Sequence, residues 1–146
     1  KAVELGAAAI VPVLASRSQG MPRGARGDKR LSHWRSIAIA ACEQCGRNRV
    51  PAIAEVAAFD EWMRAPPAGP VAIAGPGATM SLAAFAMRTP PRTIVIGPEG
   101  GFTEREMAQA VARGFAAVHL GPRVLRADTA AVAALATLAA VAGDAR

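Results

Sequence analysis

Residues 93–129 decide the fold of this chain: TIVIGPEGGFTEREMAQAVARGFAAVHLGPRVLRADT. The run Thr93–Gly97 is apolar and rich in β-branched residues, as is typical of a buried strand. Thr103, followed three residues later by Glu106, has the capping-box pattern that begins a helix. A second apolar run, Ala116–Leu120, follows that helix. Strands that alternate with helices in this way predict an α/β fold with a mostly parallel sheet flanked by helices.

The rest of the chain adds elements of the same two kinds. Apolar residues between Leu31 and Cys45 recur at helical spacing, which predicts an amphipathic helix that ends at Gly46. Pro12 lacks a backbone donor, so a strand that contains it lies near a sheet edge or ends early. The further elements that we expect are strands over 7–14 and Val71–Ala74, a mobile loop over 16–30, a short helix over 57–64, a helix from Thr103 to Arg113 ended by Gly114, and a last helix capped by Asp128 or Thr129.

Length and composition limit the classes of protein to which this chain can belong. Its 146 residues suffice for one domain with a single core, and 52% apolar residues exclude a disordered chain. The apolar run Ala130–Ala142 is shorter than the roughly 18 residues of a membrane span, so we expect a buried helix and no membrane partner. Two cysteines are too few for a disulfide scaffold. The chain starts without Met, and we expect it to be part of a longer protein.

The positive charge is confined to one stretch of the sequence. The chain has 17 Lys and Arg against 11 Asp and Glu, a net charge of +6. Segment 17–49 holds eight basic and two acidic residues and therefore accounts for the whole surplus. Fifteen of the 17 basic residues are Arg, whose planar guanidinium forms paired hydrogen bonds with phosphate. The stretch is typical of a nucleic-acid contact as much as of a solvated basic loop.

Two glycine-containing loops follow predicted strands. Gly97–Gly101 (GPEGG) comes after the first strand of the opening stretch, and 120–129, which contains Arg123 and Arg126, comes after the second. In open α/β sheets ligands bind beyond the carboxyl ends of the strands, where glycines let the backbone approach them closely. We expect the two loops to share one pocket. Neither has the spacing of a standard phosphate-binding loop, and a plain strand–helix turn is the alternative.

The sequence contains no group of residues with the spacing of a metal site. Cys42 and Cys45 form a CxxC pair, but structural zinc needs four ligands, and His33 and His119 are distant in the sequence. The pair ends a predicted helix, whereas a redox CxxC opens one. We therefore expect no metal, two small residues packed on a helix face, a surface His33, and a half-buried His119 without a catalytic role.

Four segments of the chain occur in an order that is specific to one family. They are Arg17-Ser18, the stretch 42–51 (CEQCGRNRVP), the loop 96–103 (IGPEGGFT), and the loop 120–126 (LGPRVLR) followed by 128–130 (DTA). Together they resemble the bacterial 16S ribosomal RNA uridine-N3 methyltransferase (RsmE) family of the SPOUT superfamily, over almost the whole chain. The departures from the family pattern are Ser16 and Asp128, where members usually have Glu, and 75–77 (GPG), which is not the usual motif after that strand.

The resemblance implies a fold, a cofactor and partners. It implies a C-terminal deep trefoil knot, S-adenosylmethionine bound in that knot, a homodimer, and methylation of a uridine N3 in 16S ribosomal RNA. Full-length members also carry an N-terminal PUA-like RNA-binding domain. We expect residues 1–146 to form the SPOUT domain without the PUA-like domain, and to be cytoplasmic. We also expect this domain in isolation to fold but to have no catalytic activity.

The resemblance also implies roles for individual residues. Arg126, with Arg123, is the candidate catalytic residue, because a guanidinium stabilises the anion that uracil forms when N3 loses its proton. The implied cofactor contacts are Gly97, Glu99, Gly100, Gly101, Leu120, Gly121, Leu125 and Thr129. The implied RNA contacts are Arg17, Arg23, Arg26, Arg30, Arg47 and Arg49.

Three other functions are compatible with the same residues. One is a different SPOUT methyltransferase that acts on a ribose 2′-OH or on transfer RNA. The second is an RNA-binding module whose pocket binds no cofactor. The third is a truncated domain that folds and dimerises without catalysis. The Gly46–Pro51 segment together with the second loop favours the uridine-N3 family over the first of these.

Overall fold

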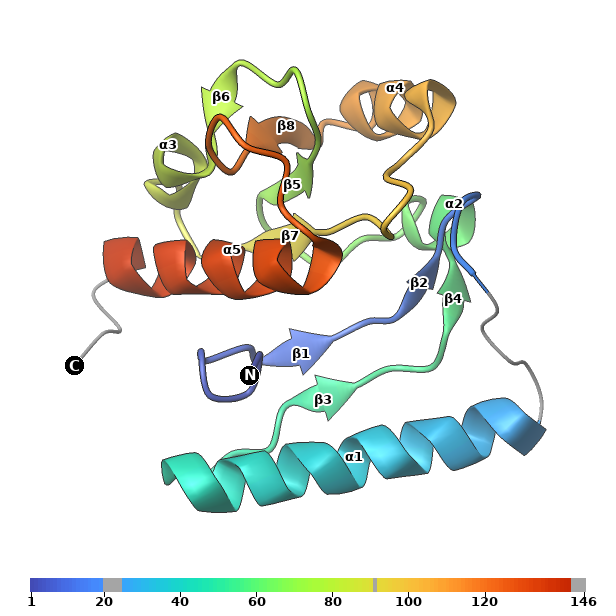
Figure 1. Cartoon of the computed structure of the whole chain (residues 1–146), viewed down its shortest axis with the longest axis vertical. Coiled ribbons are helices and arrows are strands. Elements are labelled where there is room, and N and C mark those ends of the chain that lie inside the picture. The colour runs from blue at the N-terminus through green and yellow to red at the C-terminus, as the bar shows by residue number, and fades with distance from the viewer. Residues whose placement is uncertain (20–24, 91, 143–146) are drawn as a thin grey trace.

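The computed structural model describes residues 1–19, 25–90 and 92–142, and Figure 1 shows how their helices and strands are arranged. The helices are α1 (Ala25–Cys45), α2 (Phe59–Trp62), α3 (Leu82–Ala86), α4 (Glu104–Ala112) and α5 (Ala127–Ala142). The strands are β1 (Ala9–Ile10), β2 (Val13–Leu14), β3 (Ala52–Ile53), β4 (Ala57–Ala58), β5 (Val71–Ala74), β6 (Met80–Ser81), β7 (Thr93–Val95) and β8 (Ala116–His119). All of the described strand pairs are parallel, so the predicted α/β class is confirmed.

The central sheet has the strand order β6-β8-β5-β7. Ala72 of β5 pairs with Ile94 of β7 on one side and with Ala116 of β8 on the other. The two strands of the opening stretch, β7 and β8, are therefore not neighbours. The earlier strand β5 lies between them, so the chain crosses over β5 as it passes from β7 to β8.

Side chains of β5 alternate between two cores, one on each face of the central sheet. Ile73 packs with Phe59 of α2 and Ala110 of α4 on one face. Ala72 packs with Phe85 of α3 and Ala134 of α5 on the other face. Both strand residues have no exposed surface, which explains why β5 is an uninterrupted apolar run rather than an alternating one.

The N-terminal half forms two short parallel pairs, β1 with β3 and β2 with β4. Pro12 lies between β1 and β2 and has no N–H to donate, so the single strand predicted over 7–14 is divided in two. Its carbonyl still accepts a hydrogen bond from the Ala57 N–H at 3.1 Å. The long helix α1, drawn below β1 and β3 in Figure 1, packs against this half through Leu31 and Cys42.

Three predicted helices differ from the observed ones. α1 begins at Ala25 rather than Leu31, so 25–30 are helical and not loop, although Ala25 is the only apolar residue of this stretch in the sequence. Residues 20–24 of the predicted loop lie outside the described residues. Of the predicted helix 57–64, only Phe59–Trp62 is helical, because the preceding Ala57–Ala58 joins β2 as a strand. Gly46 ends α1 as predicted, with a φ of +73°.

The last helix was predicted to be capped by Asp128 or Thr129, and this is wrong. α5 begins at Ala127, so both residues lie in its first turn. The N–H of Ala130 bonds to the Arg126 carbonyl at 2.8 Å, so Arg126, directly before the helix, occupies the N-cap position. Asp128 accepts from the neighbouring Thr129 N–H at 2.7 Å.

In the part of the chain that the structure describes, no helix is long and apolar enough to cross a membrane. The parallel strands and their flanking helices are those expected of the SPOUT superfamily. The trefoil knot stays a prediction.

Candidate functional site: a pocket at the carboxyl edge of the central sheet

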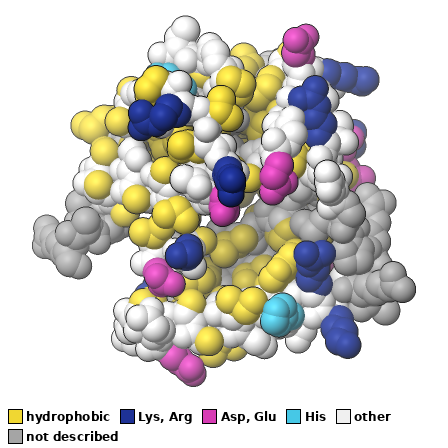
Figure 2. Space-filling model, viewed as in Figure 1, with side chains coloured by type: hydrophobic (Ala, Val, Ile, Leu, Met, Phe, Trp, Pro, Cys, Tyr) yellow, Lys and Arg dark blue, Asp and Glu magenta, His cyan; other side chains and the backbone are white. Residues whose placement is uncertain are grey.

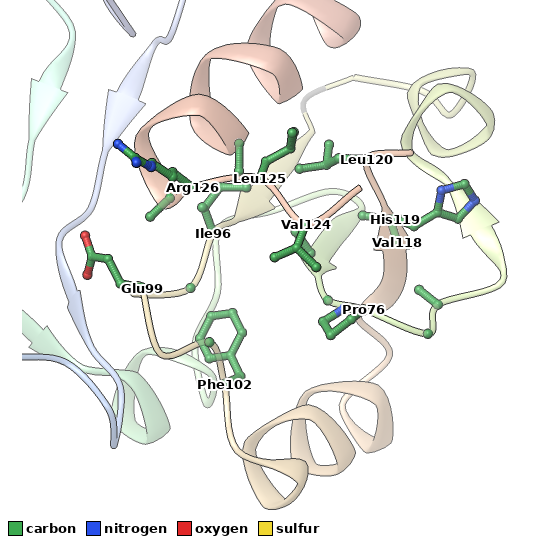
Figure 3. A pocket seen from close by; sticks show the side chains of 18 of the residues that line it. Pro76, Ile96, Glu99, Phe102, Val118, His119, Leu120, Val124, Leu125 and Arg126 are labelled. Atoms are coloured by element: carbon green, nitrogen blue, oxygen red, sulfur yellow. The ribbon is translucent and has the colours of Figure 1, made fainter. Parts of the chain in front are cut away.

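A pocket of about 850 Å³ lies beyond the carboxyl ends of three strands of the central sheet (Figure 3). Its lining comes from the loops after β5 (74–78), β7 (96–102) and β8 (118–127), together with Arg17, Met107 and Ala130. The prediction that the second and third of these loops share one pocket is confirmed. The strand order explains why the first loop joins them, because β5 lies between β7 and β8.

Glycines let these loops approach other groups closely. A Cβ on Gly97 would lie 3.1 Å from the Phe102 ring, and that ring in turn stacks on Phe59 with centroids 4.9 Å apart. A Cβ on Gly75 would lie 2.7 Å from the methyl carbon of Met107. Gly121 has a φ of +117°, a conformation that other residues rarely adopt. The glycines therefore shape the walls of the pocket.

The loop after β7 is fixed at its far end by the predicted capping box, which is confirmed. The Thr103 hydroxyl accepts from the Glu106 N–H at 3.2 Å, and the Glu106 carboxylate accepts from the Thr103 N–H at 2.8 Å. The same carboxylate accepts from the N–H and hydroxyl of Ser16, at 2.7 and 3.0 Å. Ser16, a departure from the usual family residue, thus ties the segment after β2 to the start of α4.

Glu106 remains charged in this position although it is only 8% exposed. Burial raises the pKa of its carboxyl, but hydrogen bonds from the backbone and hydroxyl groups of Thr103 and Ser16 outweigh burial, and its pKa lies below the ordinary value. Four donors to one carboxylate stabilise the ionised form. Glu106 is therefore a structural anchor for the pocket and was not singled out as such by the sequence.

The pocket is apolar inside and charged at one side. Ile96 and Leu125 lie in its interior, whereas the side chains of Glu99 and Arg126 both extend to the same side of the pocket in Figure 3. His119 lies on the other side in that view, and its Nδ1 accepts from the Gly121 N–H at 3.2 Å. His119 is half-buried, as predicted. The arrangement suits a ligand with an apolar ring and a polar or charged end.

Most of the predicted cofactor residues line this pocket. They are Gly97, Glu99, Gly100, Gly101, Leu120, Gly121 and Leu125, joined by both candidate catalytic residues, Arg123 and Arg126. Thr129 is not among the lining residues, and its N–H and hydroxyl donate to Asp128 within α5. The functional role of each of these residues stays a prediction.

Several lining residues were not predicted. The loop 74–78 lines the pocket, although in the sequence its residues 75–77 stand out only as a departure from the family motif. Its Gly-Pro-Gly sequence directly after the buried strand Val71–Ala74 is the same signal that identified the other two loops. The sequence around Phe102 and Met107 does not predict that they line the pocket, because each is an ordinary apolar residue near the start of a helix.

The predicted RNA contacts are dispersed in the structure. Arg30 and Arg49 are exposed, and the Arg30 guanidinium lies 5.5 Å from the centre of the Trp34 ring. Arg47 is half-buried and donates to the carbonyls of Val3 and Ala7 at 2.6 and 3.0 Å. Arg17 lies at the pocket. Arg23 and the side chain of Arg26 lie outside the described residues.

The surface view agrees with this dispersion. Figure 2 shows Lys and Arg side chains scattered over one face of the molecule, with Asp and Glu among them. The basic side chains that this view colours are therefore not gathered into one patch on that face.

Cys42 is buried and Cys45 is half-buried on α1, as predicted, and His33 is exposed. Cys42 packs with Val3 and Ile53 in the core beneath α1. Within residues 1–19, 25–90 and 92–142, no three His, Cys, Asp or Glu side chains are grouped closely enough to hold a metal ion.

Comparison with known proteins finds relatives of similar sequence. The ribosomal RNA small subunit methyltransferase E of Buchnera aphidicola subsp. Schizaphis graminum is 32% identical over 145 residues, which cover 99% of this chain and 59% of the relative. The protein of the same name from Bacillus subtilis is 31% identical and is matched over 94% of this chain and 57% of its own length. The chain thus spans less than two thirds of these relatives.

Solved structures share the fold. A methyltransferase from Legionella pneumophila in complex with S-adenosylmethionine matches with a TM-score of 0.89 and 36% identity, over 94% of this chain and 57% of its own. The small subunit methyltransferase E of Neisseria gonorrhoeae, bound to S-adenosylmethionine, matches with a TM-score of 0.87 and 38% identity, over 96% and 57%.

The model of one family, the RNA methyltransferase domain, matches residues 1–139. This match covers both halves of the fold and all three pocket loops. The chain therefore belongs to the RNA methyltransferase domain family and, within it, resembles the ribosomal RNA small subunit methyltransferase E proteins.

Proposed function

We propose that the pocket binds S-adenosylmethionine and that the full protein methylates N3 of a uridine in 16S ribosomal RNA. The observation that carries this proposal is the meeting of three glycine-containing loops at one edge of a parallel sheet, in a chain of the RNA methyltransferase family. Two relatives with this fold were solved with S-adenosylmethionine bound. The choice of uridine N3 follows the motif resemblance at 42–51, 96–103 and 120–130.

The residues of the pocket fit this cofactor. A volume of about 850 Å³ falls within the range of roughly 300–1,000 Å³ that is usual for ligand pockets. Ile96, Leu120 and Leu125 supply apolar surface for a purine ring, and the backbone of Gly97–Gly101 supplies hydrogen-bonding groups beside it. S-adenosylmethionine supplies a methyl group activated by its sulfonium, and the chain supplies orientation toward the acceptor.

The side of the pocket where Arg126 lies suits the acceptor base. Arg123 and Arg126 are both exposed, and neither forms a salt bridge with the acidic residues that the structure describes. Their guanidinium groups are thus available to a ligand. Arg126 would stabilise the negative charge that develops on uracil as N3 loses its proton, with Arg123 in support.

We assign the RNA phosphates to five arginines of segment 17–49. Arg30 and Arg49 are exposed, and both are placed to reach a phosphate backbone. Arg23, Arg26 and Arg47 complete the proposed set, Arg47 through the guanidinium N–H groups that do not bond to Val3 and Ala7. Recognition of RNA through phosphates and an unstacked base is the usual mode for sequence-specific sites.

The helix α5 supports a homodimer. Its only charged residue is Asp128, yet only Ala130 and Ala134 of its described residues are buried by the rest of the chain. Apolar side chains such as Val132 and Leu135 remain partly exposed, and a second copy of the chain would cover them. We further propose that residues 1–146 form one SPOUT domain with a C-terminal trefoil knot, located in the cytoplasm.

Nucleoside mass spectrometry tests the proposal. The full protein that contains this chain is incubated with small ribosomal subunits and methyl-labelled S-adenosylmethionine, and the RNA is digested. Labelled 3-methyluridine is the expected product. A 2′-O-methylated nucleoside, or labelling of transfer RNA alone, would instead identify a different SPOUT activity, and RNA binding without any labelled product would identify a binding module.

A further inference from the structure

We propose that Arg17 is a positioning residue of the cofactor pocket rather than a phosphate contact. Through Gly100 it holds the loop Gly97–Gly101 in the conformation that receives the adenosyl group. This inference rests on the proposed binding of S-adenosylmethionine. It reassigns a residue that the sequence groups with the basic stretch 17–49.

Two contacts join Arg17 to the loop. Its Nη1 donates to the Gly100 carbonyl oxygen at 2.8 Å. Its aliphatic stem also lies across the loop, because a Cβ added to Gly100 would meet the Cβ and Cδ of Arg17 at 3.3 and 3.4 Å. The first contact fixes the orientation of one peptide group, and the second occupies the space that any side chain at position 100 would need.

Arg17 is itself held in place by its neighbours. Ser16 donates twice to the buried carboxylate of Glu106 at the start of α4. The Ser18 N–H bonds to the Ala15 carbonyl at 3.0 Å, and the Ser18 hydroxyl accepts from the Ala15 N–H at 3.0 Å. The segment 15–18 is therefore a fixed turn, and Arg17 extends from it toward Gly100.

The loop is consequently held at two points by one segment. Glu106 also accepts from Thr103, which ends the loop, while Arg17 contacts Gly100 near its middle. The contacts of Ser16 with Glu106 and of Arg17 with Gly100 each span more than 80 residues of sequence. Removal of the Arg17 side chain leaves the Glu106 anchor intact and frees only the centre of the loop.

Three substitutions separate the parts of this arrangement. Arg17→Met keeps an aliphatic stem over Gly100 and removes the donor, Arg17→Ala removes both, and Arg17→Lys keeps a cationic donor. Arg35→Ala is the matched control, because Arg35 is an exposed arginine of α1 that does not line the pocket. Thermal unfolding of each variant verifies that the fold is retained.

Two ligands distinguish positioning from direct contact. S-adenosylmethionine carries a carboxylate that a guanidinium could bind, whereas 5′-methylthioadenosine has the same adenosyl group and no carboxylate. If Arg17 acts through the loop, calorimetry shows both ligands bound about three- to tenfold more weakly by Arg17→Ala and Arg17→Met, the usual value of one hydrogen bond. Arg17→Lys restores part of that loss, and Arg35→Ala binds like the wild type.

Hydrogen exchange of the free chain gives a readout that needs no ligand. We expect the amide hydrogens of Gly100 and Gly101 to exchange faster in Arg17→Ala than in the wild type, and the exchange rates of the α4 amides to stay the same. Unchanged affinity for both ligands, or weaker binding of S-adenosylmethionine alone, would overturn the inference, the latter by making Arg17 a direct carboxylate contact. A wild-type chain that binds neither ligand would contradict the proposed function instead, and the exchange rates would still decide whether Arg17 braces the loop.

Discussion

The carboxylate of Glu106 accepts hydrogen bonds from both the N–H and the hydroxyl of Ser16, at 2.7 and 3.0 Å, across 90 residues of sequence. Its second oxygen accepts from the N–H and hydroxyl of Thr103, at 2.8 and 2.9 Å. One side chain thereby joins the N-terminal half of the chain to the loop that borders the pocket.

The variant Glu106→Gln is expected to lower the free energy of unfolding by about 1–3 kcal/mol, since a partly buried N–H is left without an acceptor. A glutamine offers one oxygen and one NH₂, so it can accept from Ser16 or from Thr103 but not from both backbone groups. Urea denaturation measures the effect. Glu104→Gln, at an exposed position in the same helix turn, is the control and is expected to stay within about 0.5 kcal/mol of the wild type.

The same link predicts a pH dependence of stability. The pKa of Glu106 is lower in the folded chain than its ordinary value of 4.5, because the donors of Thr103 and Ser16 outweigh the effect of burial. Its contribution is therefore full above about pH 4.5 and is lost as the pH falls through the folded-state pKa. The difference in unfolding free energy between wild type and Glu106→Gln should shrink over that range. A difference that stays constant down to pH 3 would show that the charge of Glu106 is not responsible.

Gly75→Ala is expected to affect the pocket more than the fold. Its new Cβ would lie 2.7 Å from the Met107 methyl carbon, which is the far end of a flexible side chain and can move. Met107 lines the pocket, so its displacement changes the pocket's shape. We predict a loss of stability below about 1 kcal/mol together with weaker binding of S-adenosylmethionine. Met107→Ala removes the clashing atoms, so Gly75→Ala should have a smaller effect on binding in that background, and an equal effect would argue against this contact.

Arg126→Ala is expected to slow methyl transfer by about 10²–10³-fold, the usual effect of losing one group that stabilises a developing anion. Binding of S-adenosylmethionine should change little, because the charge on the acceptor appears only during the reaction. Single-turnover kinetics with the full protein measure the rate, and calorimetry measures the binding. Methylation that proceeds at the wild-type rate would exclude the anion-stabilising role.

Arg47→Ala is expected to lower stability as well as any affinity for RNA. Its guanidinium donates to two carbonyls near the N-terminus, those of Val3 and Ala7. Loss of these bonds should cost about 1–3 kcal/mol in urea denaturation. Arg49→Ala removes an exposed arginine nearby, and only its RNA affinity and salt dependence should change. Equal stability of the two variants would contradict the structural role of Arg47.

The sequence predicted elements wherever a local pattern was complete. The capping box at Thr103 and Glu106 needs only four consecutive residues, and α4 begins where it predicts. The start of α1 was missed because 25–30 has no apolar residue besides Ala25 to extend the helical period, although Asp28 in the first turn favours a helix N-terminus. The short elements β6 and α3 offer too few residues for any period to be read.

The sequence predicted those parts of the site that lie in a single loop directly after a recognisable strand. Gly97–Gly101 and 120–127 each follow a strand that the sequence marks, and both line the pocket. The contribution of 74–78 depends on the order in which strands pair, and β5 lies between β7 and β8 although it precedes both in the chain. The contacts of Ser16 and Arg17 with residues 100–106 depend on tertiary structure alone, so no local sequence pattern predicts them.

Calorimetric titration of this chain with S-adenosylmethionine tests the central claim most directly. We predict saturable binding with one ligand per chain, weakened by Gly75→Ala and by Arg17→Ala and unaffected by Arg35→Ala. Absence of any heat of binding at millimolar ligand, from a chain that unfolds cooperatively, would contradict the assignment of the pocket as the cofactor site.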